Sequence, residues 1–394
     1  MKKILFCLQT MVMGGVEKEL ITILNKLDYS QYDVTVLLAY VEDKSIVDAI
    51  PKNVTVKILN LDKGYFFSGV QGLVTTRIKK GRIIEALKIL CGRTLFKKPC
   101  SEIISFKNVQ CLDEQFDYAV CYHMHSSFML RYVDEKVKAK RKIVWIHNDF
   151  SSTGFKVERY KKRLSGYDKY IAVSKRVREE FVERLPEFSE KTEVVHNYLN
   201  AEDIVSLAKQ KTDSASFDND GNTKLVTVGR ICSQKGYDLA AYACKKIIAD
   251  GFNITWYMIG GGDDTEIKQL IERLHIKDNF ILLGRKDNPY PYVKAADLYV
   301  QPSRHEALCL TVNEARILGK VVICTDFAGA DEQVVDGYDG IIVKAFTHED
   351  IALTIEKVLG DKERFLQLKD NAEKTNEQGE KEWQKILSVF EDIK

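Results

Sequence analysis

The sequence predicts two doubly wound α/β domains, each a parallel sheet with helices on both faces. The chain has 394 residues, more than one ordinary hydrophobic core holds. Short apolar segments of strand length alternate with amphipathic segments of helical period along most of it. Because the short segments are apolar throughout rather than at every second residue, we expect strands buried on both faces, as in parallel sheets.

The first half opens with a short apolar segment and a glycine loop. This predicts a buried strand rather than a signal peptide, because no small-residue cleavage site follows and Glu17-Lys18-Glu19 arrives at once. Strands are predicted at 2–8, 33–39, 54–58, 117–121, 142–146, 169–173 and 192–196. Helices are predicted at 15–27, 78–90, 126–133, 156–165 and 175–185.

The second half repeats the alternation. Strands are predicted at 224–229, 254–259, 279–283, 297–300, 320–324 and 340–343. Helices are predicted at 235–250, 263–274, 289–295, 311–318, 329–335 and 348–359. In folds of this class ligands bind at the carboxyl ends of the strands, so the cleft between the domains is the expected active site.

Turn residues and polarity indicate where the domains divide. Residues 209–222 are polar and rich in turn formers, which predicts a linker or an exposed loop. We therefore expect a first domain over 1–199 and a second over 200–375. Residues 376–394 place Trp383, Ile386, Leu387 and Phe390 at helical spacing, which predicts one amphipathic helix that packs back on the first domain.

Composition excludes several classes of protein. No apolar run approaches the roughly 18 residues of a membrane span. The nine cysteines are scattered singly without a Cys-x-x-Cys pair, which argues against a disulfide framework or a zinc site and for a reducing cytoplasm. Net charge is +2, but residues 1–200 hold 34 Lys+Arg against 24 Asp+Glu, and the remainder 25 against 33. This asymmetry suggests that the first domain faces an anionic partner.

Glu306 and Glu314 are the most informative polar residues. We expect the first on a loop after a buried strand and the second on the helix that starts near Thr311, at the same end of the sheet. Acceptor-only carboxylates beside the free amides of a helix N-terminus suit a sugar nucleotide. The amides would take the diphosphate and the carboxylates the sugar and ribose hydroxyls. Two glutamates at this spacing also occur by chance on solvated helix faces.

The segment 228–236 adds cations at the end of the first strand of the second half. Gly229 allows a sharp exit from the strand, and Arg230 and Lys235 can point into the cleft, where a diphosphate would need them. A solvated loop before a helix is the alternative reading of this segment. Gly260-Gly261-Gly262 resembles a dinucleotide fingerprint but lacks the third glycine position, so we interpret it as a structural turn.

Taken together, these motifs resemble the retaining family-4 glycosyltransferases of the GT-B fold. The resemblance rests on Val228-Gly229-Arg230, the Lys235-Gly236 pair, and Glu306 and Glu314 with the following Ala315 and Gly319. It extends to most of the chain. The supporting segments are Met13-Gly14-Gly15-Val16-Glu17, Trp145-Ile146-His147, Ile171-Ala172-Val173-Ser174, Val195-His196-Asn197, and Asn288-Pro289-Tyr290-Pro291-Tyr292, the last similar to bacterial members that build surface polysaccharides.

The resemblance implies a role for each matching residue. Gly14 and Gly15 let the backbone approach the donor phosphate, and His147 reaches across the cleft towards the sugar. Arg230 and Lys235 neutralise the diphosphate, the electrostatic effect that usually dominates such transfers. Glu306 holds sugar hydroxyls near the reacting carbon, Glu314 holds the ribose, and the backbone around Arg285 meets the base. The implied catalytic and donor-binding set is Glu306, His147, Arg230, Lys235, Gly14, Gly15, Arg285, Ala307, Leu308, Cys309, Leu310 and Glu314.

This chain departs from the family pattern in two loops. Ala307 stands where the family commonly has glycine, and Ala328-Gly329-Ala330 replaces a later Gly-Gly loop. Alanine tolerates fewer backbone conformations than glycine, so both departures bear on the amide contacts of these loops.

A basic segment over 63–98 is the third feature with functional content. It holds nine Lys/Arg against one acid, with aromatic and aliphatic residues between them. This composition predicts contact with an anionic membrane surface or a lipid-diphosphate acceptor, while a solvated helix face is the alternative. No nucleic-acid-binding motif accompanies it. The expected acceptor or membrane contacts are Arg77, Lys79, Lys80 and Arg82.

The resulting hypothesis is a hexosyltransferase that uses a nucleotide-diphosphate donor, UDP-linked, and a glycan or lipid-linked glycan acceptor in polysaccharide biosynthesis. By resemblance it retains the anomeric configuration and needs neither metal nor other cofactor. We expect it in the cytoplasm, peripheral on the cell membrane. The alternatives are a sugar-nucleotide 2-epimerase of the same fold and a non-catalytic sugar-nucleotide-binding subunit. Asp218-Asn219-Asp220 has the form of a metal-binding D-x-D but falls in the polar segment.

Overall fold

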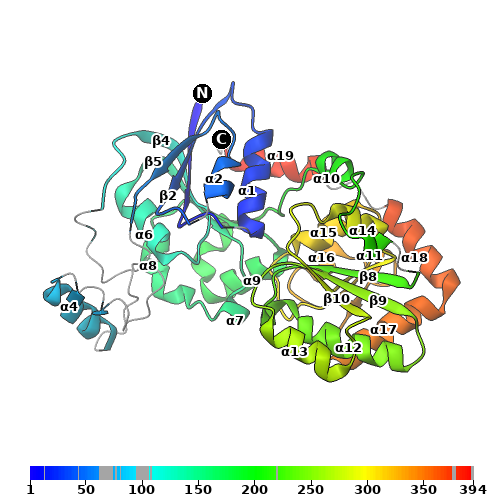
Figure 1. Ribbon diagram of the computed structural model, residues 1–394. Coiled ribbons are helices and arrows are strands. Elements are labelled where there is room, and N and C mark those ends of the chain that lie inside the picture. Colours follow the sequence, from blue (N-terminus) through cyan, green and yellow to red (C-terminus); the bar gives the residue numbers. More distant parts are fainter. Residues whose placement is uncertain are drawn as a thin grey trace. The chain divides into compact units, whose positions relative to one another are not determined.

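The computed structural model describes residues 1–12, 14–42, 44–61, 74–75, 78–79, 81–94, 106, 109–218, 221–374 and 379–391. Arg77 and Lys80, half of the basic segment over 63–98, and two residues of the D-x-D triplet lie outside this range. The contacts of the chain divide it into two compact units (Figure 1). Unit 1 comprises Met1–His196 and Leu387–Lys394, and unit 2 comprises Asn197–Ile386.

Unit 1 is built on a parallel sheet of order β3-β2-β1-β4-β5-β6-β7 within the described residues. Its strands are β1 (Lys2–Leu8), β2 (Tyr32–Leu38), β3 (Thr55–Ile58), β4 (Gln115–Cys121), β5 (Lys138–Ile146), β6 (Lys169–Ala172) and β7 (Thr192–Val194). Its helices are α1 (Gly15–Lys26), α2 (Lys44–Asp48), α4 (Ile83–Thr94), α6 (Ser127–Lys136), α7 (Phe150–Thr153), η2 (Val157–Tyr160), α8 (Lys161–Leu164), α9 (Lys175–Arg184) and η3 (Pro186–Lys191).

Unit 2 is built on a second parallel sheet, of order β10-β9-β8-β11-β12-β13. Its strands are β8 (Thr223–Val228), β9 (Ile254–Ile259), β10 (Phe280–Gly284), β11 (Leu298–Gln301), β12 (Val321–Thr325) and β13 (Gly340–Val343). Its helices are α10 (Ala201–Leu207), α11 (Ala215–Asp218), η4 (Ser233–Lys235), α12 (Tyr237–Ala249), α13 (Thr265–Leu274), α14 (Tyr290–Ala295), α15 (Leu310–Ile317), α16 (Ala330–Gln333), α17 (His348–Gly360), α18 (Lys362–Lys374) and α19 (Gly379–Val389), which continues into unit 1.

Helices cover both faces of the second sheet, which explains why its strands are apolar on both sides. On one face α12, α13, α17 and α18 pack around Trp256, Met258 and Val300. On the other, α10, α11, α14, α15 and α16 pack around Tyr257 and Tyr299 (Figure 1). The prediction of doubly wound parallel sheets is therefore confirmed.

The strand order indicates at which strand ends a ligand would bind. The order reverses at the first strand of each sheet, so β1 lies between β2 and β4, and β8 lies between β9 and β11. Loops that leave two neighbouring strands on opposite sides open a crevice there, which is where α/β sheets bind ligands. The loops after β8 and β11 in unit 2, and after β1 and β4 in unit 1, are therefore the expected ligand-binding positions.

The interpretation of residues 209–222 as a linker is wrong. The segment lies inside unit 2, and Phe217 on α11 is fully buried. Its ring lies 4.6 Å from that of Tyr257 and 4.9 Å from that of Tyr292, centroid to centroid. A single aromatic residue among polar ones gave no periodic signal, yet burying one aromatic side chain is enough to attach the segment to the core.

Three further segments can be compared with the predictions. The helix predicted over 156–165 is a 3₁₀ turn, Val157–Tyr160, followed by the short α8. Helix α18 was not predicted, because only Leu368 and Ala372 of its thirteen residues are buried and the apolar stripe is too narrow to read. The final helix ends with Phe390 against Phe6 and Tyr118 of unit 1, at centroid distances of 5.9 and 5.6 Å.

Candidate active site

Glu306 is the most strongly held carboxylate at the switch point of unit 2. It follows β11, and its side chain is only 9% exposed. Its Oε1 accepts hydrogen bonds from Lys235 Nζ at 2.5 Å and from Ser303 Oγ at 2.8 Å. Within the described residues, its Oε2 has only a long contact of 3.4 Å with Gln234 Nε2. One oxygen is therefore occupied, while the other keeps acceptor capacity for a ligand hydroxyl.

A buried polar network fixes the hydroxyl of Ser303. Gln301 Nε2 donates to Ser303 Oγ at 2.8 Å, so the hydroxyl hydrogen is free to point at Glu306. The side-chain Oε1 of Gln301 accepts in turn from the Tyr299 hydroxyl at 2.7 Å and from the Thr311 hydroxyl at 3.1 Å. Both Gln301 and Ser303 are fully buried. Sequence reasoning missed this network, although two polar residues at the end of an apolar strand were the available signal.

Lys235 reaches Glu306 because glycines let the backbones approach. Gly236 has φ +66°, and a Cβ there would lie 2.0 Å from the carbonyl oxygen of Pro302. A Cβ on Gly229 would press on the stem of Lys235, 3.2 Å from its Cδ. Burial acts to lower the pKa of Lys235, but the Glu306 carboxylate outweighs it and holds that pKa above its usual value. The ammonium group is therefore charged.

Gly260, which follows β9, packs against the backbone of the loop after β8. A Cβ there would lie 1.7 Å from the carbonyl oxygen of Gly229, an oxygen that also accepts a hydrogen bond from Tyr237 at 2.6 Å. The glycine at position 260 is thus needed for backbone packing beside β8, which explains Gly260-Gly261-Gly262 without a bound dinucleotide.

Arg230 differs from Lys235 in having no partner. Its side chain is exposed directly after Gly229, and it makes no hydrogen bond or ion pair with the described part of the chain. Arg285, after β10, is also exposed, and its Nη2 lies 3.8 Å from an oxygen of the almost fully exposed Asp287. Both cations are available to an anionic ligand without first breaking a buried contact.

The N-terminus of α15 lies on the loop that carries Glu306. Gln333 holds its N-cap residue, Cys309, by two hydrogen bonds: the backbone N–H donates to Oε1 at 2.9 Å, and the carbonyl accepts from Nε2 at 2.7 Å. No side chain caps the helix. Within the described residues, the amides of Leu310 and Thr311 make no hydrogen bond. Free first-turn amides and the helix dipole favour an anion there.

Glu314 lies on α15 and has a partner of its own. It is 5% exposed, and Tyr290 OH donates to its Oε1 at 3.0 Å. Burial and the neighbouring carboxylate raise the pKa of Tyr290, so the phenol stays protonated and remains a donor. The structure thus places the two glutamates in separate hydrogen-bonding environments.

The alanines that replace family glycines are not strained. Among the described residues other than glycine, only Asn60 and His275 have positive φ. Ala307, Ala328 and Ala330 therefore adopt backbone conformations open to any residue, while Gly329 keeps φ +72° between the last two. The departures from the family pattern leave the loop backbones unstrained.

In unit 1 the glycine loop leads directly into a helix. Gly14 is the extended N-cap of α1, with φ −151°, and no side chain caps the helix. A Cβ on Gly14 would lie 2.6 Å from Oε2 of Glu17. The helix begins at Gly15, and the dipole of a helix whose first turn no side chain caps favours an anion at that end.

His147 follows β5 and is fully enclosed. Its Nδ1 lies 3.5 Å from Oε2 of Glu19, which is itself buried, but neither ring nitrogen makes a hydrogen bond within the described residues. Burial, reinforced by His123, lowers the pKa of His147 well below its usual value. The ring is therefore neutral, and the contact with Glu19 is not an ion pair. Glu19 was not foreseen, although a glutamate among the buried Leu20, Ile23 and Leu24 of α1 was visible.

Two further observations concern absent features. Among the described residues, no three His, Cys, Asp or Glu side chains gather in a way that could hold a metal ion. None of the described helices is long and apolar enough to cross a bilayer.

Comparison with known proteins finds a family that resembles the second unit. Residues 208–375 match the family described as Glycosyl transferases group 1. The matched segment contains Lys235, Glu306 and Glu314, together with the network behind them.

Relatives of known sequence match part of the chain. An uncharacterised glycosyltransferase of Methanocaldococcus jannaschii is 28% identical over 252 residues, which cover 59% of this chain and 63% of that protein. A capsular polysaccharide biosynthesis glycosyltransferase of Staphylococcus aureus is 29% identical over 136 residues, or 34% of this chain and 36% of that protein. The matches thus span less than two thirds of these relatives.

Solved structures match the whole chain in fold. Anabaena HepE in complex with UDP and glucose has a TM-score of 0.72 at 17% identity, covering 100% of both chains. S. aureus TarM, crystallised with UDP and other ligands, has a TM-score of 0.68 at 12% identity over the same coverage. These likenesses show the fold, two Rossmann-like α/β units of the GT-B type.

We predict that Lys235→Ala lowers the melting temperature. It removes the closest partner of a largely buried carboxylate. The cost should be about 2–3 kcal/mol, below that of a fully buried pair because Ser303 and Gln234 still contact Glu306. Thermal unfolding monitored by circular dichroism measures it.

The matched control is Arg230→Ala, which removes the same charge from an exposed and unpartnered position nearby. It should change stability by less than about 0.5 kcal/mol. The double variant Lys235→Ala/Glu306→Gln should regain part of the loss, because no charged carboxylate is then left without its cation. Equal melting temperatures for the two single variants would show that the ion pair adds nothing to stability.

Proposed function

We propose that this protein is a retaining hexosyltransferase that uses a UDP-sugar and transfers its sugar to a glycan or lipid-linked glycan in polysaccharide biosynthesis. The observation that carries the proposal is the Lys235–Glu306 pair at the switch point of unit 2, together with Arg230 on the same loop as Lys235, which has no partner among the described residues. Together they offer fixed cations for a diphosphate and an acceptor oxygen for a sugar hydroxyl.

The cations are suited to stabilise the departing nucleotide. Only one donor of the Lys235 ammonium is used by Glu306, so two N–H groups remain for phosphate oxygens. Arg230 adds a planar group that can bind phosphate in bidentate fashion. When the bond from the anomeric carbon to the diphosphate breaks, the electron pair leaves with UDP, and these charges stabilise it most at that moment.

The two carboxylates bind different parts of the donor, Glu306 the sugar and Glu314 the nucleoside. Oε2 of Glu306 is the acceptor left for a donor-sugar hydroxyl, and Glu314, held by Tyr290, accepts from the ribose. The acceptor hydroxyl attacks the anomeric carbon as the bond to the diphosphate breaks, and its proton passes to the departing diphosphate oxygen. The first-turn amides of α15 and the cations supply the charge compensation that a metal ion supplies in other transferases, so the reaction is proposed to need no metal.

The choice of UDP is supported by the structural relatives. Anabaena HepE was solved with UDP and glucose, and S. aureus TarM with UDP. The relatives of known sequence include glycosyltransferases named for capsular polysaccharide and lipopolysaccharide core biosynthesis. These names describe the relatives, and they motivate the same class of donor and product for this chain.

A nucleotide screen tests the proposal directly. UDP and UDP-hexoses should raise the melting temperature by roughly 5 °C or more at saturation, because they bind only the folded state, while GDP and ADP should do less. UDP-hexose should be hydrolysed slowly to UDP and free sugar, and EDTA should leave the rate unchanged. If the product is instead a UDP-sugar epimerised at C2, the protein is an epimerase and not a transferase. Binding without any turnover would indicate a non-catalytic subunit.

Three substitutions test the division of labour in the site. Arg230→Ala and Glu306→Gln should slow turnover by about 100- to 1000-fold, because each removes a contact that strengthens in the transition state. Glu314→Ala should instead weaken UDP binding, since its partner is the ribose. Isothermal titration with UDP and initial rates on each variant separate the two effects. Equal losses of UDP affinity in Glu306→Gln and Glu314→Ala would refute the separate roles.

We further propose that unit 1 works at an anionic membrane surface. Helix α4 exposes Ile83, Ile84 and Leu87 at 59%, 71% and 54%, at positions that share one helical face. Lys79 and Lys88, among the described residues of the same segment, are exposed cations. An apolar helix face with flanking lysines suits the boundary between headgroups and acyl chains.

Vesicle binding tests this location. The protein should co-sediment with vesicles that contain phosphatidylglycerol at low salt and be released as salt rises, because such attraction is screened within about 10 Å at 0.1 M. Ile84→Ser/Leu87→Ser and Lys79→Ser/Lys88→Ser should each weaken binding without changing UDP affinity. The control Lys52→Ser/Lys191→Ser removes two exposed cations elsewhere in unit 1 and should bind normally. Wild-type indifference to these vesicles would favour an acceptor free in solution.

A further inference from the structure

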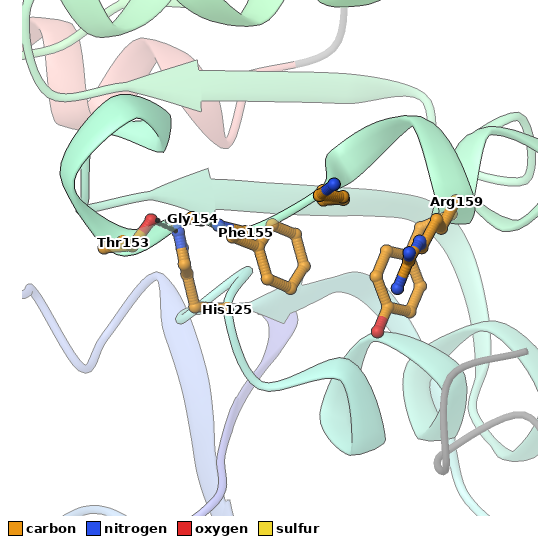
Figure 2. Close-up of a pocket in the computed structure, with 7 residues that line it drawn as sticks. His125, Thr153, Gly154, Phe155 and Arg159 are labelled. Carbon is orange, nitrogen blue, oxygen red and sulfur yellow. Dashed lines mark hydrogen bonds between the residues drawn. The ribbon is translucent and has the colours of Figure 1, made fainter. Parts of the chain in front are cut away.

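Unit 1 contains a pocket that the donor site does not use. It has a volume of 490 Å³ and lies where the chain leaves β4 and β5. His125 contributes from the loop after β4, and Thr153, Phe155, Lys156, Arg159 and Tyr160 contribute from α7 and η2 after β5 (Figure 2). These are carboxyl ends of neighbouring parallel strands, and the volume is in the usual range of roughly 300–1,000 Å³ for small-molecule sites.

One side of the pocket is an aromatic surface. The rings of Phe155 and Tyr160 stack with centroids 5.1 Å apart and an interplanar angle of 2°. The His125 ring lies 4.5 Å from Phe155, and in the view of Figure 2 Phe155 lies between His125 and Arg159. An apolar ring face beside polar groups is typical of sites for ligands that are themselves apolar on one face and polar at the edge, such as sugar rings.

The charge of the pocket comes from two cations without partners. Lys156 and Arg159 are exposed, and neither makes an ion pair or side-chain hydrogen bond with the described residues. No carboxylate lines the pocket. The nearest acid in sequence, Glu158, is paired with Arg184 at 3.3 Å. The pocket therefore carries two positive charges that an anionic group can neutralise.

His125 adds a polar but uncharged group. The Thr153 hydroxyl donates to the carbonyl of Asp149 at 2.7 Å, so towards His125 Nε2, 3.0 Å away, it can only accept. The proton of the neutral ring is therefore on Nε2, and Nδ1 is an acceptor, buried and without a hydrogen-bond partner in the described residues. Burial lowers the pKa of His125 to about 3, so the ring adds no charge at neutral pH.

We propose that this pocket binds the acceptor through a sugar unit that carries an anionic group, a carboxylate or a phosphate. The ring would lie on the Phe155–Tyr160 surface and the anion between Lys156 and Arg159. The inference rests on the proposed function, because it names the acceptor class of the same enzyme. It adds that the acceptor is acidic, which the match to the group 1 family leaves open.

Direct binding tests the pocket without any donor. The probes are digalacturonate, glucose 1-phosphate, neutral maltose and inorganic phosphate, each measured by isothermal titration on the full chain. Digalacturonate or glucose 1-phosphate should bind at least about tenfold more tightly than maltose, since a hydrogen-bonded charge is worth that much or more. Which of the two binds better identifies a carboxylate or a phosphate as the anion.

Three variants locate the binding. Lys156→Ala/Arg159→Ala should lose the preference for the acidic probes, Arg159→Lys should keep part of it, and Phe155→Ala should weaken all sugar probes. Lys162→Ala removes an exposed cation close in sequence but outside the pocket and should bind as wild type. Melting temperatures confirm that each variant is folded. Equal binding of maltose and digalacturonate, or unchanged binding in the double variant, would overturn the proposal.

The outcomes separate this inference from the proposed function. UDP binding and UDP-hexose hydrolysis should be unchanged in Lys156→Ala/Arg159→Ala, because neither residue belongs to the proposed donor site. If UDP binds and acidic sugars do not, the inference fails while the transferase stands. If no nucleotide binds, the transferase fails, and the titrations still decide whether the pocket takes acidic sugars. Inorganic phosphate bound as tightly as glucose 1-phosphate would reduce the pocket to a simple anion site and refute the sugar contact.

Discussion

The buried carboxylate of Glu306 is the constraint on which the candidate site depends. A carboxylate that is 9% exposed needs a cation and hydrogen bonds, since an uncompensated charge in such a position is strongly destabilising. Lys235 can supply them only because Gly236 passes the carbonyl of Pro302 and Gly260 passes that of Gly229, at separations that no Cβ allows. The loops after β8 and β11 are joined by this ion pair and by further hydrogen bonds, among them that from Arg304 Nη1 to the carbonyl of Ser233 at 2.7 Å. The remaining N–H groups of Lys235 and the Oε2 of Glu306 are left available to a ligand.

Burial has a different effect on the titratable groups discussed in the two units. In unit 2 the charged groups are kept charged, because Lys235 and Glu306 compensate each other and burial does not outweigh the attraction. In unit 1, burial keeps His147 and His125 neutral, and the free charge lies at exposed positions such as Lys156, Arg159 and Lys88. The excess of Lys+Arg over residues 1–200 thus includes cations that have no ion-pair partner among the described residues. Such cations are suited to attract anionic partners rather than to stabilise the unit.

The sequence predicted most of the fold because its strands are apolar throughout and its helices have a clear period. The strands at 254–259 and 340–343 were placed to the residue. The prediction from sequence was wrong where a single residue decides the outcome, as where the buried Phe217 attaches a polar segment to the core. For the site, it picked out Glu306, Glu314, Arg230 and Lys235 as chemistry-bearing residues at strand ends. It could not find Gln301, Tyr290 or Glu19, since their importance lies in contacts with residues distant in the chain.

By itself the sequence determined the fold class, because burial on both faces of a strand and the period of a helix are properties of short segments. It also determined which charged residues follow strand ends. Only the tertiary structure decided which of those charges are paired: Lys235 with Glu306, Glu314 with Tyr290, and Arg230 with none of the described residues. Only the tertiary structure brought His125 and Arg159 to one pocket. The physical reason is that pairing, burial and the resulting proton affinities depend on distances of a few ångströms between segments that the chain itself separates widely.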